Sequence, residues 1–148
     1  MKGAIVSAAL AIALMPDVSA QDKPNFAGKW KASGSFTSWT ITVEGSRMTV
    51  TQTIAGNSDS TVYRLDGTPS IKTMDGPNGP VENVLTSTWE GAVLVTTITS
   101  PSMTRIERRS IEPDGTMRVQ TIITMMQGKP APPPPPGAGA GQVLRKVG

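Results

Sequence analysis

The segment NFAGKW, residues 25–30, opens the part of the chain that is predicted to fold. From Phe26 onward the sequence is rich in Thr, Val and Ile and is interrupted by glycine-containing turns. This composition is typical of β-strands rather than helices. Within the segment, Gly28 allows a strand to bend or to approach a neighbour closely, and a large aromatic side chain such as Trp30 is usually buried. We therefore expect Trp30 to be a core residue of a β structure.

Residues 1–20, which precede this segment, have the order of a secretory signal peptide. A positive charge comes first, an apolar run covers residues 4–15, and small residues stand before Gln21. We expect cleavage after Ala20 and a periplasmic or secreted protein. The apolar run is shorter than the roughly 20 residues of a membrane-spanning helix, so we expect no membrane span in the mature chain. The absence of cysteine excludes a disulfide framework and a lipidated cysteine.

The rest of the chain, residues 21–148, is predicted to form one domain, because a chain of this length buries enough surface for a single core. The net charge of the whole sequence is +3. This is a small surplus, whereas proteins that bind polyanions usually cluster far more positive charge. We therefore expect no nucleic-acid partner.

The alternation of side chains is clearest in SWTITVE, residues 38–44, and in MTVTQTI, residues 48–54. Apolar and polar residues alternate in both, which predicts strands with one buried face. A sheet of many consecutive hairpins has two exposed edge strands unless it closes into a barrel. The predicted fold is therefore all-β, an antiparallel up-and-down barrel of about 8–10 strands with no long helix after the signal peptide. The predicted strands cover residues 26–32, 37–44, 47–54, 60–66, 70–74, 82–90, 92–99, 103–112, 116–126 and 142–147.

One segment interrupts this pattern: GKPAPPPPPGAGAG, residues 128–141. Proline has a fixed φ and no amide hydrogen, so we expect a proline-rich loop outside the sheet, with residues 130–136 extended as polyproline II. Such a loop can dock a protein partner of the cell envelope that reads proline. The alternative is a stiff surface arm without a partner.

The tripeptide Gly28-Lys29-Trp30, preceded by Phe26, resembles the opening of the lipocalins and of lipocalin-like small β-barrels found in exported bacterial proteins. The segments TVYRLDG (61–67), TWEGAVLVTT (88–97) and ERRSIEPDGTMRV (107–119) resemble the repeated hairpins of that bacterial group. The resemblance implies that the tryptophan plugs the closed end of the barrel and that a basic side chain of the last strand packs across its ring. The implied barrel-closing residues are Gly28, Trp30 and Arg145, with Lys146 as the alternative to Arg145.

The chain contains no His and no Cys, so the commonest general base, the thiolate nucleophile and the usual zinc ligands are missing. Acidic residues lie mainly in Asp-Gly and Glu-Gly turns, which hairpin geometry explains. The sequence also lacks a calcium loop, a phosphate-binding glycine motif and a Gly-x-Ser-x-Gly elbow. We therefore predict no catalytic residue, no metal site, no cofactor and a protein that is not an enzyme.

The strand predicted near residues 103–112 carries an unusual number of charges. Counting in twos from Ile111 places Arg109, Glu107 and Arg105 on one face. If this face points inward, the charges form a partly compensated cluster that binds the carboxylate of an amphipathic ligand. If it points outward, they form a solvated ladder of ion pairs, which is the commoner arrangement because charged residues are seldom buried. The alternation alone does not decide between the two.

A barrel of this size either fills its interior with side chains or encloses one small ligand. We predict an exported barrel that binds a hydrophobic or amphipathic small molecule. The alternative is a structural or protein-interaction module of the cell envelope with a packed interior. Methionine adapts to varied apolar shapes, although ordinary core packing explains its abundance equally well. The candidate ligand-binding residues are Trp39, Met48, Val50, Tyr63, Trp89, Arg105, Arg109 and Met117, with Leu65 and Met125 as further candidates for the lining.

Overall fold

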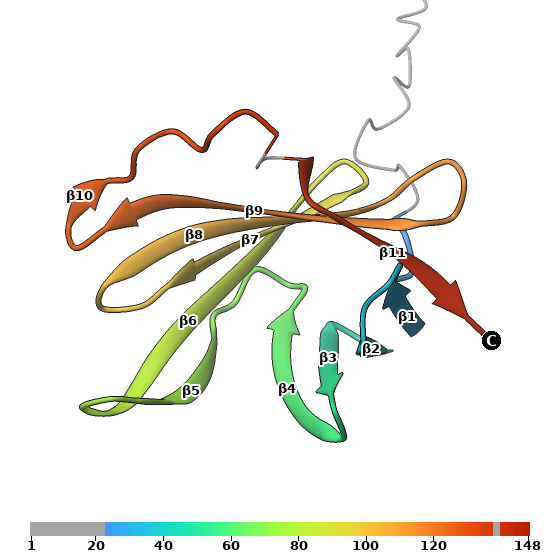
Figure 1. The fold of residues 1–148 in the computed structure, drawn as a ribbon, viewed down its shortest axis with the longest axis horizontal. Helices are drawn as coiled ribbons and strands as arrows, with labels where there is room; N and C mark the ends of the chain where they lie inside the picture. The colour runs from blue at the N-terminus through green and yellow to red at the C-terminus, as the bar shows by residue number, and fades with distance from the viewer. Residues whose placement is uncertain (1–22, 138–139) are drawn as a thin grey trace, which may run out of the picture.

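The structure is a computed structural model that describes residues 23–137 and 140–148. The predicted signal peptide, residues 1–20, lies outside the described residues. The described part forms one sheet of eleven strands (Figure 1). The strands are β1 Gly28–Ala32, β2 Thr37–Glu44, β3 Arg47–Ile54, β4 Asn57–Arg64, β5 Ser70–Gly76, β6 Gly79–Glu90, β7 Val93–Thr99, β8 Met103–Ile111, β9 Met117–Met126, β10 Lys129–Pro130 and β11 Gln142–Val147.

The strands pair in the order β4-β3-β2-β1-β11-β9-β8-β7-β6-β5, and β10 pairs with β9 beside this path. Strand β1 meets β11 in an antiparallel ladder that runs from Lys29↔Val147 to Ala32↔Leu144. The sheet therefore curls into a nearly closed, lipocalin-like barrel, as predicted, and the described residues contain no α-helix. In particular, no described helix is long and apolar enough to cross a membrane.

The hydrophobic core gathers around Trp30 at one end of the barrel. The indole is 2% exposed, and its Nε1 donates a hydrogen bond to the carbonyl oxygen of Phe26 at 2.9 Å. Strand alternation brings the other core side chains to the same interior, because successive residues of a strand point to opposite faces. The buried apolar residues are Phe26, Trp30, Ile41, Met48, Val50, Tyr63, Leu85, Leu94, Ile98, Met117 and Leu144.

Strand β4 begins at Asn57, earlier than the predicted start at residue 60. The turn before it consists of Ala55 and Gly56, whose φ angles of 49° and 82° are both positive. This two-residue hairpin turn matches the twist of the flanking strands and keeps them paired up to Ile54↔Asn57. The polar residues that open β4 are exposed, so their side chains gave no alternation by which to recognise a strand.

The proline-rich segment joins the sheet at its start, contrary to the expectation that it would stay outside. Pro130 pairs with Met125 in β10, and the amide of Ala131 donates to the carbonyl oxygen of Thr124 at 2.9 Å. An edge strand tolerates proline, because only one side of its backbone needs partners. From there the segment runs past β9 and returns to β11 (Figure 1).

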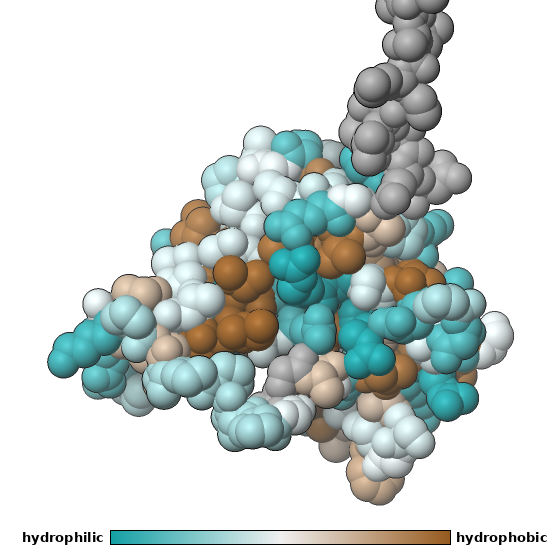
Figure 2. Space-filling view, turned by 90° about the horizontal axis from the view of Figure 1, so that it is seen from above, coloured by the Kyte–Doolittle hydropathy of each residue, from teal (hydrophilic) through white to brown (hydrophobic). Residues whose placement is uncertain are grey.

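The outer surface is not uniformly polar. Figure 2, seen from above, shows a patch of hydrophobic surface beside hydrophilic surface. Three exposed apolar residues, Ile122, Ile123 and Met126, belong to β9, next to the proline-rich segment.

The circuit of backbone pairing is interrupted between β4 and β5. These strands follow each other in the chain, yet they stand at opposite ends of the pairing order and share no ladder in the described structure. Their edges are connected by side chains instead, including a hydrogen bond from Ser70 Oγ to the carbonyl oxygen of Val62 at 2.6 Å. The barrel therefore has a seam on one side, which we call the β4–β5 seam.

Candidate functional site

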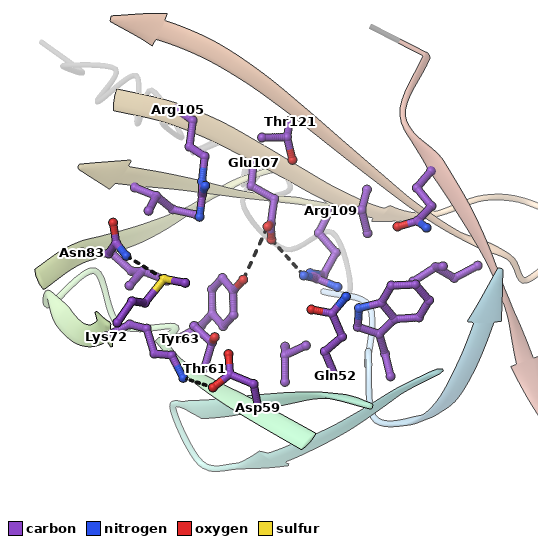
Figure 3. A pocket seen from close by; sticks show the side chains of 18 residues that line it. Gln52, Asp59, Thr61, Tyr63, Lys72, Asn83, Arg105, Glu107, Arg109 and Thr121 are labelled. Carbon is purple, nitrogen blue, oxygen red and sulfur yellow. Dashed lines mark hydrogen bonds and ion pairs between the residues drawn. The ribbon is translucent and has the colours of Figure 1, made fainter. Parts of the chain in front are cut away.

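The interior of the barrel contains a cavity of about 320 Å³ beyond the packed core. Figure 3 shows its polar side chains converging from opposite walls of the barrel. Apolar and polar residues line it together, which is the usual composition of a small-molecule site. The lining residues are Trp39, Val50, Gln52, Asp59, Thr61, Tyr63, Lys72, Met74, Asn83, Leu85, Ile98, Arg105, Glu107, Arg109, Val119, Thr121, Gln142 and Leu144.

A charged cluster occupies the inner wall of this cavity. Arg109 Nη2 lies 2.8 Å from Glu107 Oε1, and the side chains of these two residues are 5% and 13% exposed. Across the barrel, the Tyr63 hydroxyl donates to Glu107 Oε2 at 3.4 Å (Figure 3). The guanidinium carbon also lies 5.7 Å from the centre of the Tyr63 ring, within cation–π range. The cluster therefore joins β4 to β8 through the interior.

The pKa values of Tyr63 and Arg109 are both raised, so both side chains stay protonated at neutral pH. Burial raises the pKa of the Tyr63 phenol, and the Glu107 carboxylate raises it further. Burial acts to lower the pKa of Arg109, but the attraction of Glu107 and Tyr63 outweighs it, so the net pKa of the guanidinium is raised. Tyr63 is thus a neutral hydrogen-bond donor, and Arg109 is a buried cation paired with a carboxylate.

Two cationic side chains of the cavity retain free hydrogen-bonding capacity. Arg109 Nε is buried and has no hydrogen-bond partner among the described residues. Its Nη1 reaches only the weak acceptor Met117 Sδ, at 3.6 Å. Arg105 also lines the cavity, and the part of the chain that the structure describes provides it with no hydrogen bond or ion pair. Arg105 is only partly buried, so its guanidinium group is accessible to an acceptor from a ligand, whereas Arg109 Nε is enclosed by the surrounding side chains.

The face of β8 that carries Arg105, Glu107 and Arg109 therefore points into the barrel. The alternative, in which these residues form a solvated ladder of ion pairs on the outer surface, is wrong. Arg105 is the register partner of Ile98, which also lines the cavity, and Glu107 is the partner of Thr121. Arg108, between Glu107 and Arg109 in sequence, points the other way and pairs with Glu90 at 2.7 Å. The burial of Arg109 is made possible by Glu107 and Tyr63, which neutralise and hydrogen-bond the cluster.

Five of the eight candidate ligand-binding residues line the cavity, namely Trp39, Val50, Tyr63, Arg105 and Arg109. Met48 and Met117 are fully buried in the core and do not line the cavity. Trp89 lies outside it and stacks on Phe26, with ring centres 6.0 Å apart. Leu65 lines the same outer groove as Trp89, and Met125 lies on β9 outside the cavity lining. These residues were misassigned because alternation gives the face of a strand but not the height along the barrel axis.

The closed end shows which basic residue covers the tryptophan. Lys146 Nζ lies 5.6 Å from the centre of the Trp30 ring, so Arg145 is not the barrel-closing residue. Trp30 and Lys146 are register partners on adjacent strands and share a face, whereas Arg145 is the exposed partner of Lys31. Gly28 has a φ of 138°, and a Cβ there would lie 2.6 Å from Lys146 Cε. The positive φ favours glycine at this position, and the absence of a Cβ leaves room for the lysine to cross the strand.

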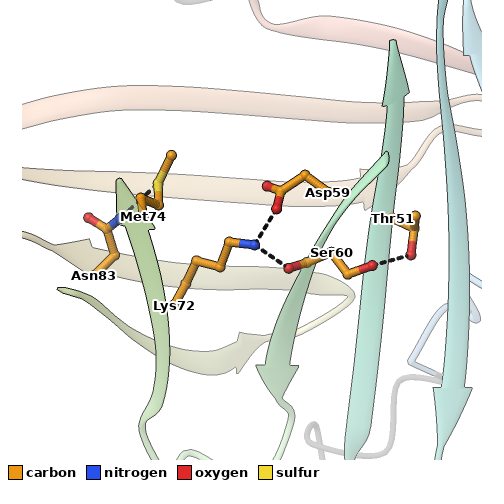
Figure 4. Close-up of polar contacts among 6 residues, drawn as sticks. All are labelled: Thr51, Asp59, Ser60, Lys72, Met74 and Asn83. Atoms are coloured by element: carbon orange, nitrogen blue, oxygen red, sulfur yellow. Dashed lines mark hydrogen bonds and ion pairs between the residues drawn. The ribbon is translucent and has the colours of Figure 1, made fainter. Parts of the chain in front are cut away.

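Much of the polar lining was not predicted from the sequence. Asp59 and Lys72 form an ion pair across the β4–β5 seam, and Asn83 donates to the Met74 sulfur at 3.1 Å beside it (Figure 4). Asp59 belongs to the polar opening of β4, which was not recognised as a strand. Asp59, Thr61 and Tyr63 share the inward face of β4, but Asp59 and Thr61 are polar, so apolar alternation in the sequence does not identify them.

The remaining acidic residues in tight turns have structural roles. Asp66 Oδ1 accepts hydrogen bonds from the amide and the hydroxyl of Thr68, and Asp114 Oδ1 accepts the same pair from Thr116. These bonds lower the pKa of both carboxyl groups. Within residues 23–137 and 140–148, no group of three or more Asp or Glu side chains is arranged to hold a metal ion.

No protein-family model matches the chain, and no curated protein matches it either. Among solved structures, a similar fold occurs in the crystal structure of a secretary abundant heat soluble (SAHS) protein from Ramazzottius varieornatus. The two structures superpose with a TM-score of 0.57 and 14% sequence identity, over 82% of this chain and 95% of that one. At this level of identity the similarity concerns the fold, and it agrees with a lipocalin-like barrel.

Proposed function

We propose that this protein is an exported, non-catalytic barrel that binds a small amphipathic molecule with an anionic head group. The observation that carries the proposal is the Arg105 side chain, which lines a cavity of about 320 Å³ and has no hydrogen bond or ion pair among the described residues. A carboxylate accepts several hydrogen bonds at once and is strongly bound by guanidinium groups. Such a head group would pair with Arg105 while its apolar part contacts the rest of the lining.

The size of the cavity limits the ligand. A water molecule takes up about 30 Å³ in the liquid, so the cavity holds about ten water-sized groups. A ligand of about ten non-hydrogen atoms therefore fits without rearrangement. Trp39, Val50 and Ile98 offer apolar surface for its tail. The existence of this space weighs against the alternative of a packed interior.

The charges of the cavity favour a single negative charge on the ligand. Glu107 already neutralises Arg109, and Asp59 already neutralises Lys72, which leaves Arg105 as the uncompensated cation among the described lining residues. A monoanion balances this charge, whereas a cation would meet it unfavourably. We propose no catalytic role for the cluster, because Tyr63 and Arg109 both hold their protons firmly.

The test compares octanoate, octan-1-ol and octylammonium, which share one tail and differ in head-group charge. Binding is followed by intrinsic tryptophan fluorescence, since Trp39 lines the cavity, and by calorimetry. We expect octanoate to bind tightest, and Arg105→Gln to weaken octanoate about tenfold while leaving octan-1-ol unchanged. Arg108→Gln, which removes the neighbouring outward arginine, is the matched control and should leave both unchanged. Equal binding of the three ligands, or no binding, would overturn the proposal.

A further inference from the structure

The β4–β5 seam is the place where the wall of the cavity has no backbone ladder. The other neighbouring strands along the path β4 to β5 exchange backbone hydrogen bonds, and these two are its ends. Unpaired strand edges leave amide and carbonyl groups free, and natural barrels remove them by closing the sheet. Here the sheet stops short of closure beside a cavity whose lining includes residues of both edges.

Side chains alone hold the seam together next to the cavity. Lys72 Nζ on β5 donates to Asp59 Oδ1 and to the carbonyl oxygen of Ser60, both on β4 (Figure 4). Farther along, Ser70 Oγ donates to the carbonyl oxygen of Val62. Asp59 and Lys72 both line the cavity, so their ion pair stands between the interior and solvent.

The ion pair between Asp59 and Lys72 is exposed enough for another anion to replace Asp59. The Asp59 side chain is 66% exposed, whereas the Lys72 side chain is 20% exposed. An exposed ion pair is weak because water and salt compete for both charges. A carboxylate arriving from solvent can replace Asp59 on Lys72 without leaving the ammonium group unpaired. Separating the two strands at this point would also break no ladder hydrogen bond.

We propose that the β4–β5 seam is the port through which an anionic amphipathic molecule reaches the cavity, with Lys72 as its outer anion-binding site. The inference rests on the proposed function, since it describes how that ligand reaches Arg105. In this route the ligand carboxylate first replaces Asp59 on Lys72. It then moves inward to Arg105, which lines the cavity. Lys72 therefore governs the rates of binding more than the final affinity.

The direct test cross-links β4 to β5 across the seam. The chain has no cysteine, so Asp59→Cys with Lys72→Cys introduces a unique pair that a short, reducible bis-methanethiosulfonate reagent can bridge. Stopped-flow tryptophan fluorescence then measures octanoate association and dissociation. Because a port changes the barrier and not the end states, we expect bridging to slow both rates about tenfold with little change in Kd. Cleaving the bridge with reductant should restore them.

The matched control is Thr73→Cys with Glu82→Cys, bridged in the same way. It ties β5 to β6 at positions that are already register partners and that do not line the cavity. We expect bridging to leave its octanoate rates unchanged. If bridging Asp59→Cys/Lys72→Cys leaves the rates unchanged as well, the ligand passes through another opening and the inference is wrong.

A second variant tests the anion site without cross-linking. Lys72→Gln should slow octanoate association about threefold and leave octan-1-ol association unchanged, because only the charged head group uses the ammonium. Lys29→Gln, which removes an exposed lysine of β1, should change neither rate. Equal slowing of both ligands would refute the anion site. Failure of the unbridged protein to bind octanoate would instead overturn the proposed function, so the two failures are distinguishable.

Discussion

Two pairs of strands close the barrel, and they are joined in different ways. Strands β1 and β11 lie far apart in the sequence and are held by four register pairs, whereas β4 and β5 follow each other and are held across the seam by side chains. The ladder lies at the end sealed by Trp30 and Lys146, and the seam lies beside the cavity. The comparison shows that a backbone ladder joins the first and last strands next to Trp30, whereas one edge of the cavity wall is joined by side chains alone.

The largest effect is expected at the closed end. Trp30→Ala removes a fully buried indole and should lower the free energy of unfolding by about 3–5 kcal/mol in urea denaturation. Trp39→Ala is the matched control, since Trp39 lines the cavity and is only partly buried. Trp39→Ala should lower the free energy of unfolding clearly less than Trp30→Ala does. Equal losses for the two variants would remove the distinction between the closed end and the cavity.

The buried charges of the cavity should give the next largest effect. Glu107→Leu leaves the Arg109 guanidinium buried without its carboxylate and should cost about 3 kcal/mol of unfolding free energy. The double variant Glu107→Leu/Arg109→Met removes both charges and should recover most of this loss. If the double variant is as unstable as the sum of the single changes, the two side chains do not act as a pair.

Gly28→Ala tests the crossing of Lys146 over the first strand. The new Cβ would lie 2.6 Å from Lys146 Cε at a φ of 138°, so the lysine must move and the backbone is strained. We expect a loss of about 2 kcal/mol in unfolding free energy. Gly34→Ala, at a φ of 71° with nothing within 4 Å of its Cβ, should lose less because only the backbone is strained. Equal losses of unfolding free energy in the two variants would mean that the Lys146 side chain moves aside without cost.

Alkaline pH provides a measure of the cavity cluster, because Tyr63 is the single tyrosine of the chain. Its pKa is raised above the ordinary value of 10.0, so folding opposes ionisation. The stabilisation is complete below pH 10 and is lost as the pH rises, by about 1.4 kcal/mol for each pH unit above that value. Tyrosinate absorbance should therefore rise only above pH 10 in the folded protein, and earlier in Glu107→Gln. A normal titration curve would contradict the buried hydrogen-bonded phenol.

The smallest effect is expected at the seam. Asp59→Asn removes one charge of a largely exposed ion pair and should change the unfolding free energy by about 0.5 kcal/mol. The same variant should accelerate octanoate association, since it frees Lys72. A loss comparable with that of Glu107→Leu would show that the seam is a structural clamp, and the contrast between the two joins would disappear.

Much of the fold follows from local patterns in the sequence. The strands at residues 37–44, 47–54 and 142–147 have the predicted bounds, because period-two alternation or flanking turns mark their ends. The start of β4 was missed because its exposed polar residues carry no such alternation. Closure between the first and last strands was expected, but the open seam was not, since pairing between consecutive strands is the usual outcome.

The site was less predictable, because its geometry depends on contacts distant in sequence. The inward direction of Glu107 is stabilised by Tyr63, 44 residues earlier, which no local pattern reveals. The choice of Lys146 over Arg145 depends on the register between the first and last strands, and a shift of one residue would reverse it. Trp89 was assigned to the cavity by its face alone, although it lies at the closed end.

The position of the seam also defines a different order in which the same strands can be connected. A circularly permuted chain that links the two ends and opens in the loop at residues 65–69 would cut no ladder. Its strands would then run from β5 to β4 with sheet neighbours adjacent in the new chain, so the mean sequence separation of contacts would fall. Such a permutant should fold faster than the natural order while keeping the same interior.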